Sequence, residues 1–503
     1  MKILSASQIR AADQFTIINE PIVAIDLMER AASACVTWIV EHFDRDFEFN
    51  IICGTGNNGG DGLAIARLLL KEDYKVQVFC INISDKRSPD FLINYERLRA
   101  ITSIIEVDTI ETFARHFHAD PHSLVLDALF GTGLNKPAEG LAADIIDQLN
   151  SSMLKIISID LPSGLYADQL NASSDKIIHA QHTLTFQFPK LSFMFPETAI
   201  AVGQFSVLDI GLDSAFIDSC VSPNYYITKK DVCSFFKKRS KFSHKGHFGH
   251  ALIVAGSYGK AGAAVLASKA CLRSGVGLLT VHIPACGYEI LQTAVPEAMT
   301  HSDSDLHYIT DTIPLGKYNA IGIGPGIGTE KKTQEALKLL LINNPLPLVI
   351  DADAINCLAE NREWLSLVPA GSVFTPHPKE FERLAGKSIN TEERLLLLRN
   401  FSSRYKVYVV LKGAHAAVCC PDGRIFFNSS GNPGMATGGS GDVLTGIITS
   451  LLAQHYNPEQ ACVLGVYLHG LAGDFAIDSK TEECLIASDI TAALPSAFAY
   501  LHS

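Results

Sequence analysis

Three loops in the first half of the sequence place glycines, amides and carboxylates directly after short apolar runs. The segment 54–62 follows an apolar run that ends at Cys53, and its glycines satisfy the pattern G-x-G-x-x-G. Asp127 and Asp160 end two similar runs. A glycine-rich helix start can bind phosphate through free N–H groups, and carboxylates beside carbonyls suit a hard cation with oxygen ligands. These loops predict an anion site with a neighbouring cation site.

Each of these features also has a purely structural interpretation. The glycine loop can be a tight turn, and each Asp can be a helix N-cap. The second strand of the half, which we expect to end at Ile81-Asn82, lacks the acidic residue of an ordinary NAD site, so a redox enzyme is not favoured. Because all three loops are expected at the same edge of one sheet, we favour a functional role.

The second half has its own candidate for phosphate chemistry, the segment 431–442. It precedes an apolar helix that we expect over 443–453. Gly438, Gly439, Ser440 and Gly441 would expose backbone N–H groups to a developing phosphoryl charge, and Asp442 could take a proton from an attacking hydroxyl. The alternative is an Asp that only stabilises the helix dipole. The four flanking glycines exceed what capping requires, which favours the catalytic interpretation.

Further glycine- or proline-containing loops in this half lie at 256–262, 324–328, 375–380 and 412–416. In 375–380 a histidine, His377, stands between two prolines that fix its backbone, and packing and function are equally open there. The chain contains no G-x-x-x-x-G-K-[ST], which excludes an ordinary P-loop NTPase.

Short strand-like runs alternate with longer helical patterns through both halves. This alternation predicts an α/β protein of parallel sheets covered by helices on both faces, with ligands beyond the carboxyl ends of the strands. The break between Gly211 and Asn224 divides the chain into two domains, 1–222 and 223–503. The expected strands are 50–53, 76–81, 124–126, 156–159, 183–188, 204–208, 251–255, 278–283, 320–323, 347–350, 372–375 and 407–411.

Composition excludes several classes of protein. With 47% hydrophobic residues and 19% charged residues among 503, the chain is not mostly disordered. A net charge of −12 argues against a dedicated nucleic-acid binder. The twelve cysteines form no C-x-x-C pair, and we see no signal peptide and no strongly apolar run of about 18 residues. We expect a cytoplasmic protein with reduced thiols and no membrane span.

The first-half loops 57–62, 127–134 and 160–164 closely resemble those of NAD(P)H-hydrate epimerase domains, over roughly residues 1 to 220. The resemblance implies a Rossmann-like three-layer domain, a potassium ion near Asn58, Asp127 and Ser163, and Lys136 with Asp160 as the acid/base pair. The substrate contacts that it implies are Asn57, Asn58, Gly59, Gly60, Asp61, Gly131, Thr132, Gly133, Leu134, Asn135, Lys136, Pro137 and Asp160.

The region from about 223 to 503 resembles the nucleotide-dependent NAD(P)H-hydrate dehydratases of the ribokinase-like fold, through 247–257, 351–356, 375–378 and 438–442. Hydrate contacts carry over to Ala263, Gly326, His377 and Asp442. Nucleotide contacts carry over to Lys412, Gly413, Ala414, His415, Ala416 and Gly441. The resemblance implies ADP as co-substrate with Mg²⁺.

Together the halves resemble the bacterial bifunctional hydrate-repair enzymes over nearly the whole chain. This implies epimerisation of hydrated NADH and NADPH (NADHX and NADPHX) and dehydration of the S epimer, with ADP converted to AMP and phosphate. We also expect a homo-oligomer. The alternative is a kinase for a vitamin precursor or sugar, fused to a non-catalytic dinucleotide sensor.

Overall fold

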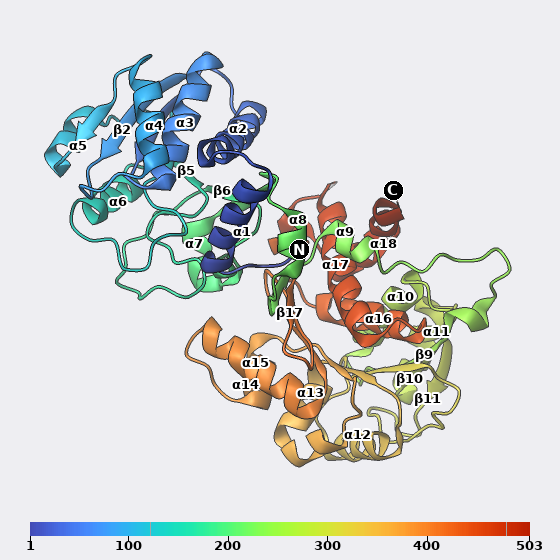
Figure 1. Ribbon diagram of the computed structural model, residues 1–503. Coiled ribbons are helices and arrows are strands. Elements are labelled where there is room, and N and C mark those ends of the chain that lie inside the picture. The colour runs from blue at the N-terminus through green and yellow to red at the C-terminus, as the bar shows by residue number, and fades with distance from the viewer. Residues whose placement is uncertain (121, 479, 503) are drawn as a thin grey trace. The chain divides into compact units, whose positions relative to one another are not determined.

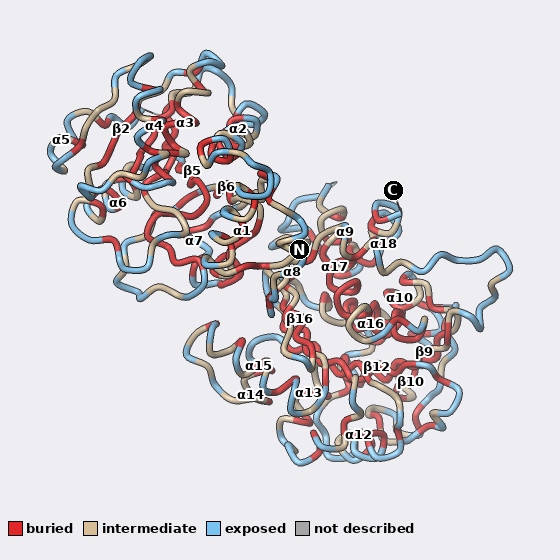
Figure 2. Tube along the Cα trace, viewed as in Figure 1, coloured by how far each residue is buried: buried red, intermediate tan, exposed pale blue. Residues whose placement is uncertain are grey.

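The computed structural model describes residues 1–120, 122–478 and 480–502, which form two compact units. Lys2–Ser222 is the N-terminal unit, and Pro223–Ser503 together with Met1 is the C-terminal unit. Each has its own sheet and its own buried apolar core, and the buried strands stand out in Figure 2.

The N-terminal unit is built on a seven-stranded parallel sheet of order β3-β2-β1-β4-β5-β6-β7. Helices α2 and α3 pack on one face and α5 and α6 on the other, which gives three layers (Figure 1). The strand order reverses between β1 and β4, where such folds bind ligands. The strands are β1 Glu48–Cys53, β2 Lys75–Ile81, β3 Ile105–Val107, β4 Ser123–Ala128, β5 Lys155–Ile159, β6 His182–Phe186 and β7 Gln204–Leu208; the helices are α1 Ala6–Asn19, α2 Ala24–His42, α3 Asn57–Lys71, α4 Pro89–Arg99, α5 Ile110–His116, α6 Leu141–Ser151, α7 Ala199–Val202 and α8 Ser214–Ser219.

The C-terminal unit has a ten-stranded sheet of order β11-β10-β9-β12-β13-β14-β15-β16-β17-β8. Helices α10, α16, α17 and α18 pack around a large core on one face, and α12 lies on the other (Figure 1). The strands are β8 Asn224–Tyr226, β9 His250–Val254, β10 Leu278–Ile283, β11 Met299–Ser302, β12 Ala320–Ile323, β13 Leu348–Ile350, β14 Val373–Phe374, β15 Tyr408–Leu411, β16 Ala417–Cys419 and β17 Ile425–Phe427; the helices are α9 Lys229–Cys233, α10 Ala261–Arg273, α11 Tyr288–Ala294, α12 Lys331–Asn343, α13 Ala352–Glu360, α14 Pro378–Ala385, α15 Thr391–Tyr405, α16 Ser440–Ala453, α17 Pro458–Ile477 and α18 Ala487–His502.

Two features of the C-terminal unit differ from the sequence-based expectation. Its sheet is not wholly parallel, because β16 pairs antiparallel with both β15 and β17. In addition, α17 is long and apolar enough to cross a membrane by length and composition alone, whereas the sequence led us to expect no strongly apolar run of about 18 residues. Its most apolar window is 67% buried, as in the core helix of a globular unit.

Candidate active sites

The glycine loop after β1 is built mainly to pack a helix against a strand. Helix α3 begins at Asn57, within this loop, rather than at 63 as expected. A Cβ on Gly59 would lie 1.8 Å from the Gly54 carbonyl oxygen, and one on Gly62 would lie 2.8 Å from Cys53 Sγ. Gly56, the N-cap, has open space around it. Close packing therefore explains Gly59 and Gly62, and the N–H groups of the first turn of α3 remain available for a ligand.

Asp127, Ser163 and Asn58 come together at the carboxyl ends of β1, β4 and β5. The buried Asp127 carboxylate accepts hydrogen bonds from Ser163 N at 2.8 Å, Ser163 Oγ at 2.5 Å and Ser158 Oγ at 2.8 Å. Asn58 Nδ2 donates to the Phe130 carbonyl at 2.8 Å. Burial raises the pKa of Asp127, and these hydrogen bonds oppose that rise.

This oxygen-rich corner fits a monovalent cation. Asn58 Oδ1 is buried and has no hydrogen-bond partner among the described residues, although its own Nδ2 is satisfied. A buried amide oxygen without a donor is costly unless a cation or water completes it. The Phe130 carbonyl, Ser163 and the Asp127 carboxylate supply further oxygen atoms nearby.

Asp160 lies on a strained backbone and is paired with a lysine that the sequence analysis did not single out. Its φ of 64° is left-handed, a conformation that non-glycine residues rarely adopt. Its Oδ1 accepts a hydrogen bond at 2.8 Å from the Nζ of Lys190, whose side chain is fully buried. Lys190 Nζ also donates to Thr185 Oγ1 at 2.9 Å and the Phe188 carbonyl at 3.2 Å. These hydrogen bonds hold the Lys190 ammonium group against the Asp160 carboxylate.

Two more carboxylates share this part of the N-terminal unit. Burial, together with Asp160 and Asp13, raises the pKa of Asp61 well above its usual range. Burial and Asp160 likewise raise the pKa of Asp13 to about 6, although Lys190 opposes this. Carboxyl groups whose pKa values are raised in this way can hold a proton near neutral pH, as acid/base chemistry requires.

The predicted contact residues in the loop after β4 differ from one another in burial and in what they contact. Gly131 lies against Asn58, since a Cβ there would be 3.3 Å from Asn58 Cβ. Lys136 is exposed, and in the described part of the chain the ammonium group on Asp160 is that of Lys190. The remaining predicted contacts are half-buried at Thr132 and Leu134 and exposed at Asn57, Gly133, Asn135 and Pro137.

In the C-terminal unit, Asp442 occupies the first turn of α16, which begins at Ser440 rather than at 443. Gly439 is its N-cap, with a left-handed φ of 90° that suits glycine. Burial and the neighbouring Asp351 raise the pKa of Asp442 to about 7, and Lys412 opposes the rise. A carboxyl group with this pKa can accept a proton at neutral pH.

Lys412 and Asp351 form an ion pair beside this turn. Lys412 Nζ lies 2.6 Å from Asp351 Oδ1, and Thr445 Oγ1 donates to Asp351 Oδ2 at 2.7 Å. A Cβ on Gly441 would lie 2.9 Å from Lys412 Nζ, so the first turn of α16 lies directly against the ammonium group. The structure thus brings Lys412, Gly441 and Asp442 together.

The predicted hydrate contacts Ala263 and Gly326 also meet. Gly326 has a φ of +65°, and a Cβ there would lie 3.1 Å from Ala263 Cβ. They lie beyond β9 and β12, where the strand order of the sheet reverses. Lys260 is ion-paired with Asp353 at 3.1 Å, and Asp353 also contributes to the raised pKa of Asp442.

The two predicted histidines, His377 and His415, both make hydrogen bonds to the protein backbone. His377 is the N-cap of α14: its Nδ1 accepts from Lys379 N and Glu380 N, and the Glu380 side chain accepts from His377 N, which makes a capping box. Its ring is still half exposed. The His415 ring is directed to the Asn428 carbonyl at 2.9 Å, and burial lowers its pKa, which favours a neutral ring. Gly413 and Ala414 are exposed, and Ala416 is half-buried.

No group of three or more His, Cys, Asp or Glu side chains suited to a metal ion occurs among the described residues. Magnesium is usually held by one or two carboxylates together with substrate phosphates, so Asp351 fits an ion that arrives with a nucleotide.

Family models match both units. The model described as NAD(P)H-hydrate dehydratase matches residues 251–496, and that described as YjeF-related protein N-terminus matches 24–192. A ribokinase-like superfamily protein from Enterococcus faecalis, 30% identical, aligns with 56% of this chain and 98% of its own at a TM-score of 0.50. The C-terminal unit therefore has the ribokinase-like fold.

Two curated relatives carry the name bifunctional NAD(P)H-hydrate repair enzyme Nnr. The one from Moorella thermoacetica is 34% identical over 98% of this chain and 96% of its own. The one from Escherichia coli is 32% identical over 93% of this chain and 88% of its own. Because similarity of this level spans both units, the chain belongs to the family of bifunctional NAD(P)H-hydrate repair enzymes.

Proposed function

We propose that this protein repairs hydrated NADH and NADPH in two reactions. The N-terminal unit interconverts the R and S hydrates, and the C-terminal unit dehydrates the S hydrate to NAD(P)H while ADP is converted to AMP and phosphate. The observation that carries the proposal is Asp442, a carboxyl group with a pKa of about 7 in the first turn of a glycine-capped helix, beside the Lys412–Asp351 pair.

Hydroxide is a poor leaving group, whereas phosphate leaves readily. Asp442 takes the proton of the C6 hydroxyl as that oxygen attacks the terminal phosphorus of the nucleotide. The N–H groups of 438–441 and the Lys412 ammonium group would stabilise the charge on the transferred phosphoryl group. Mg²⁺ would supply further charge neutralisation when bound with the nucleotide. Phosphate then leaves with help from the ring nitrogen.

Epimerisation inverts C6 and needs a proton delivered and removed near that carbon. Asp160, held by Lys190, and the high-pKa Asp61 are the groups suited to this. Asn58, Asp127 and Ser163 would hold K⁺, which would add a fixed positive charge near the bound dinucleotide. Lys136, an exposed cation in the loop after β4, belongs to the same proposal.

The choice of ADP rests on the resemblance to bacterial fusion enzymes. We also propose that the protein is cytoplasmic and forms a homo-oligomer. A solved Bacillus subtilis relative is described as ADP/ATP-dependent; it is 29% identical and aligns with 55% of this chain and 98% of its own at a TM-score of 0.48. ATP is therefore the donor to test beside ADP.

The test is incubation of purified R and S hydrates with ADP or ATP and Mg²⁺, followed at the dihydronicotinamide absorbance and by chromatography. We expect NAD(P)H, AMP and phosphate in equal amounts with ADP. A stable phosphorylated product without dihydronicotinamide would support the small-molecule kinase instead. Activity with ATP and none with ADP would overturn the donor.

A further inference from the structure

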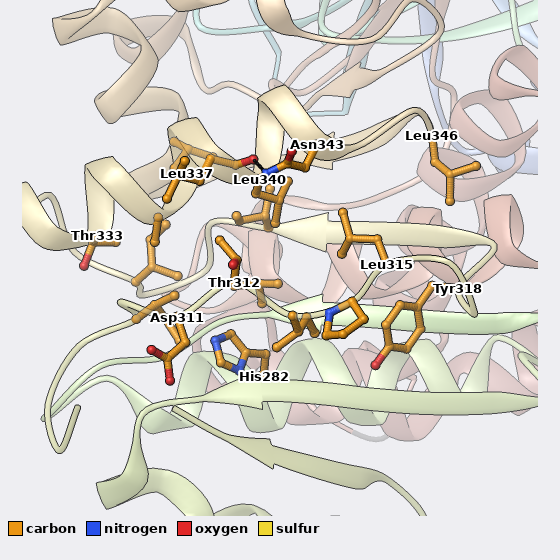
Figure 3. A pocket seen from close by; sticks show the side chains of 18 of the residues that line it. His282, Asp311, Thr312, Leu315, Tyr318, Thr333, Leu337, Leu340, Asn343 and Leu346 are labelled. Carbon is orange, nitrogen blue, oxygen red and sulfur yellow. Dashed lines mark hydrogen bonds between the residues drawn. The ribbon is translucent and has the colours of Figure 1, made fainter. Parts of the chain in front are cut away.

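A cavity of about 610 Å³ lies in the C-terminal unit, lined by none of the residues predicted to bind hydrate or nucleotide (Figure 3). It occupies the sheet face opposite the core around α16. Ile253 and Val281 belong to that core, so the alternation of strand side chains turns Val254 and His282 toward the cavity. The segment 309–318, which has no helix or strand, and α12 form its other walls.

The walls are mostly apolar, and the size suits a small organic molecule, because ligand pockets commonly enclose about 300–1,000 Å³. Figure 3 shows leucines from α12 facing Leu315 across the cavity, with Tyr318 and Leu346 at one end. The apolar lining residues are Val254, Ile309, Ile313, Pro314, Leu315, Ile323, Ile327, Ala336, Leu337, Leu339, Leu340, Pro345 and Leu346. A ligand that fills this space needs an apolar body.

The opposite end of the cavity is polar. Thr333 is 1% exposed, and among the described residues its hydroxyl has no partner. Nε2 of His282, which is 2% exposed, lies 3.1 Å from the Asp303 carboxylate. Buried polar atoms are rarely left unpaired in native proteins. A hydrogen-bonding head group at this end would pair the Thr333 hydroxyl.

The charges of the side chains at this end of the cavity determine which kind of head group can bind there. The Asp311 carboxylate accepts bonds from Ser304 N at 2.8 Å and Ser304 Oγ at 3.0 Å, which leaves lone pairs free. Burial lowers the pKa of His282, so its ring favours the neutral form, and the cavity lining contains no Lys or Arg. An anionic head would meet only negative and neutral groups here.

We propose that this cavity binds a small amphipathic amine, whose apolar body lies between α12 and Leu315 and whose ammonium group lies beside Asp311 and the Thr333 hydroxyl. The site is independent of the proposed repair activity.

Binding to the full-length protein is measured by calorimetry and NMR with three probes of equal length: 4-phenylbutylamine, 4-phenylbutan-1-ol and 4-phenylbutyrate. A charge-assisted contact should make the amine bind at least about tenfold more tightly than the alcohol, with the carboxylate weakest. Equal affinities, or no binding of the amine, would overturn the proposal.

Variants locate the site. Ala336→Phe fills the cavity and should abolish amine binding, and Thr333→Val should weaken it. Asp311→Asn, at a half-buried position, should remove the preference for the amine over the alcohol while the protein stays folded. Asp422→Asn, at a surface carboxylate, is the control and should change nothing. Amine binding that survives both Asp311→Asn and Ala336→Phe would contradict the assignment.

Discussion

Asp442 combines burial with a position at the N-terminus of α16, and these two features have opposite effects on its charge. The helix start favours the carboxylate, whereas burial and Asp351 disfavour it and dominate. Replacing Asp442 by Asn preserves the shape but removes the base. We expect the dehydration rate to fall by about two to four orders of magnitude, with epimerisation unchanged. Asp478→Asn, at the exposed end of α17, is the control. A near-normal dehydration rate would exclude Asp442 as the base.

The pH dependence follows from the same group. The base form of Asp442 exists above its pKa of about 7, so kcat/KM for the S hydrate should rise through that range and level off above it. For folding the sign is reversed: a carboxyl pKa raised from 3.8 destabilises the protein progressively as the pH rises from about 4 to about 7. Asp442→Asn should therefore raise the free energy of unfolding at pH 8, by up to about 4 kcal/mol, and hardly at pH 4. Equal effects at both pH values would contradict the shift.

Lys190 and Lys136 are two lysines with different environments and separable consequences. Lys190→Met removes the buried partner of Asp160 and should destabilise the N-terminal unit by about 3–5 kcal/mol, with loss of epimerisation. Lys136→Met, at an exposed position, should leave stability unchanged and lower epimerisation only if this lysine reaches the substrate. Calorimetry together with chromatographic epimer ratios separates the two. Normal epimerisation by a folded Lys190→Met protein would refute its role on Asp160.

Sequence reasoning found Asp160 but not its surroundings. Lys190 lies 30 positions further along the chain, beyond β6, and only the fold brings it to Asp160. Asp13 comes from α1, where it looks like an ordinary surface carboxylate of a polar helix. By contrast, the capping role of His377 could have been predicted, because Pro378 and Glu380 complete a helix-start pattern.

At the scale of elements, the packing of α3 on β1 depends on glycines that no side chain can replace. Gly59→Ala would place a methyl group 1.8 Å from the Gly54 carbonyl oxygen, a backbone atom that cannot move aside alone. We expect the N-terminal unit to lose about 3 kcal/mol of stability or more, seen as a lower melting temperature. Gly133→Ala, with nothing within 4 Å, should melt normally, so any loss of epimerisation there would report a substrate contact. A normally stable Gly59→Ala protein would contradict the packing.

Each of the twelve runs predicted as strands overlaps a strand, although several predicted ends differ by one or two residues, because apolar β-branched runs between turn residues have few alternatives in a buried parallel sheet. The omitted strands are short and carry weaker signals: β3 has three residues and β11, Met299–Ser302, includes polar ones. Helices α3 and α16 begin earlier than predicted, at Asn57 and Ser440, because the glycines suggested a loop where the structure continues the helix. Tertiary packing there overrides local propensity.

At the scale of the molecule, each unit repeats one arrangement. Most predicted site residues follow the carboxyl ends of parallel strands: β1, β4 and β5 in one sheet, and β9, β12, β14 and β15 in the other. Alternating sequence patterns predict that arrangement for both halves. Pairing distances such as Lys412 to Asp351 depend on residues far apart in sequence and required the structure.

Because each unit has its own core and its own set of predicted site residues, the two reactions should be separable in one experiment. Full-length Asp160→Ala should repair S hydrate but leave R hydrate unused, and full-length Asp442→Asn should epimerise without dehydrating. An equal mixture of the two variants should then convert R hydrate completely to NAD(P)H with ADP, since S hydrate released by one protein is substrate for the other. The control is the double variant, which carries Asp160→Ala and Asp442→Asn and is assayed alone. It should catalyse neither epimerisation nor dehydration. Failure of the mixture, with each single reaction intact, would mean that the hydrate passes between units of one molecule without release.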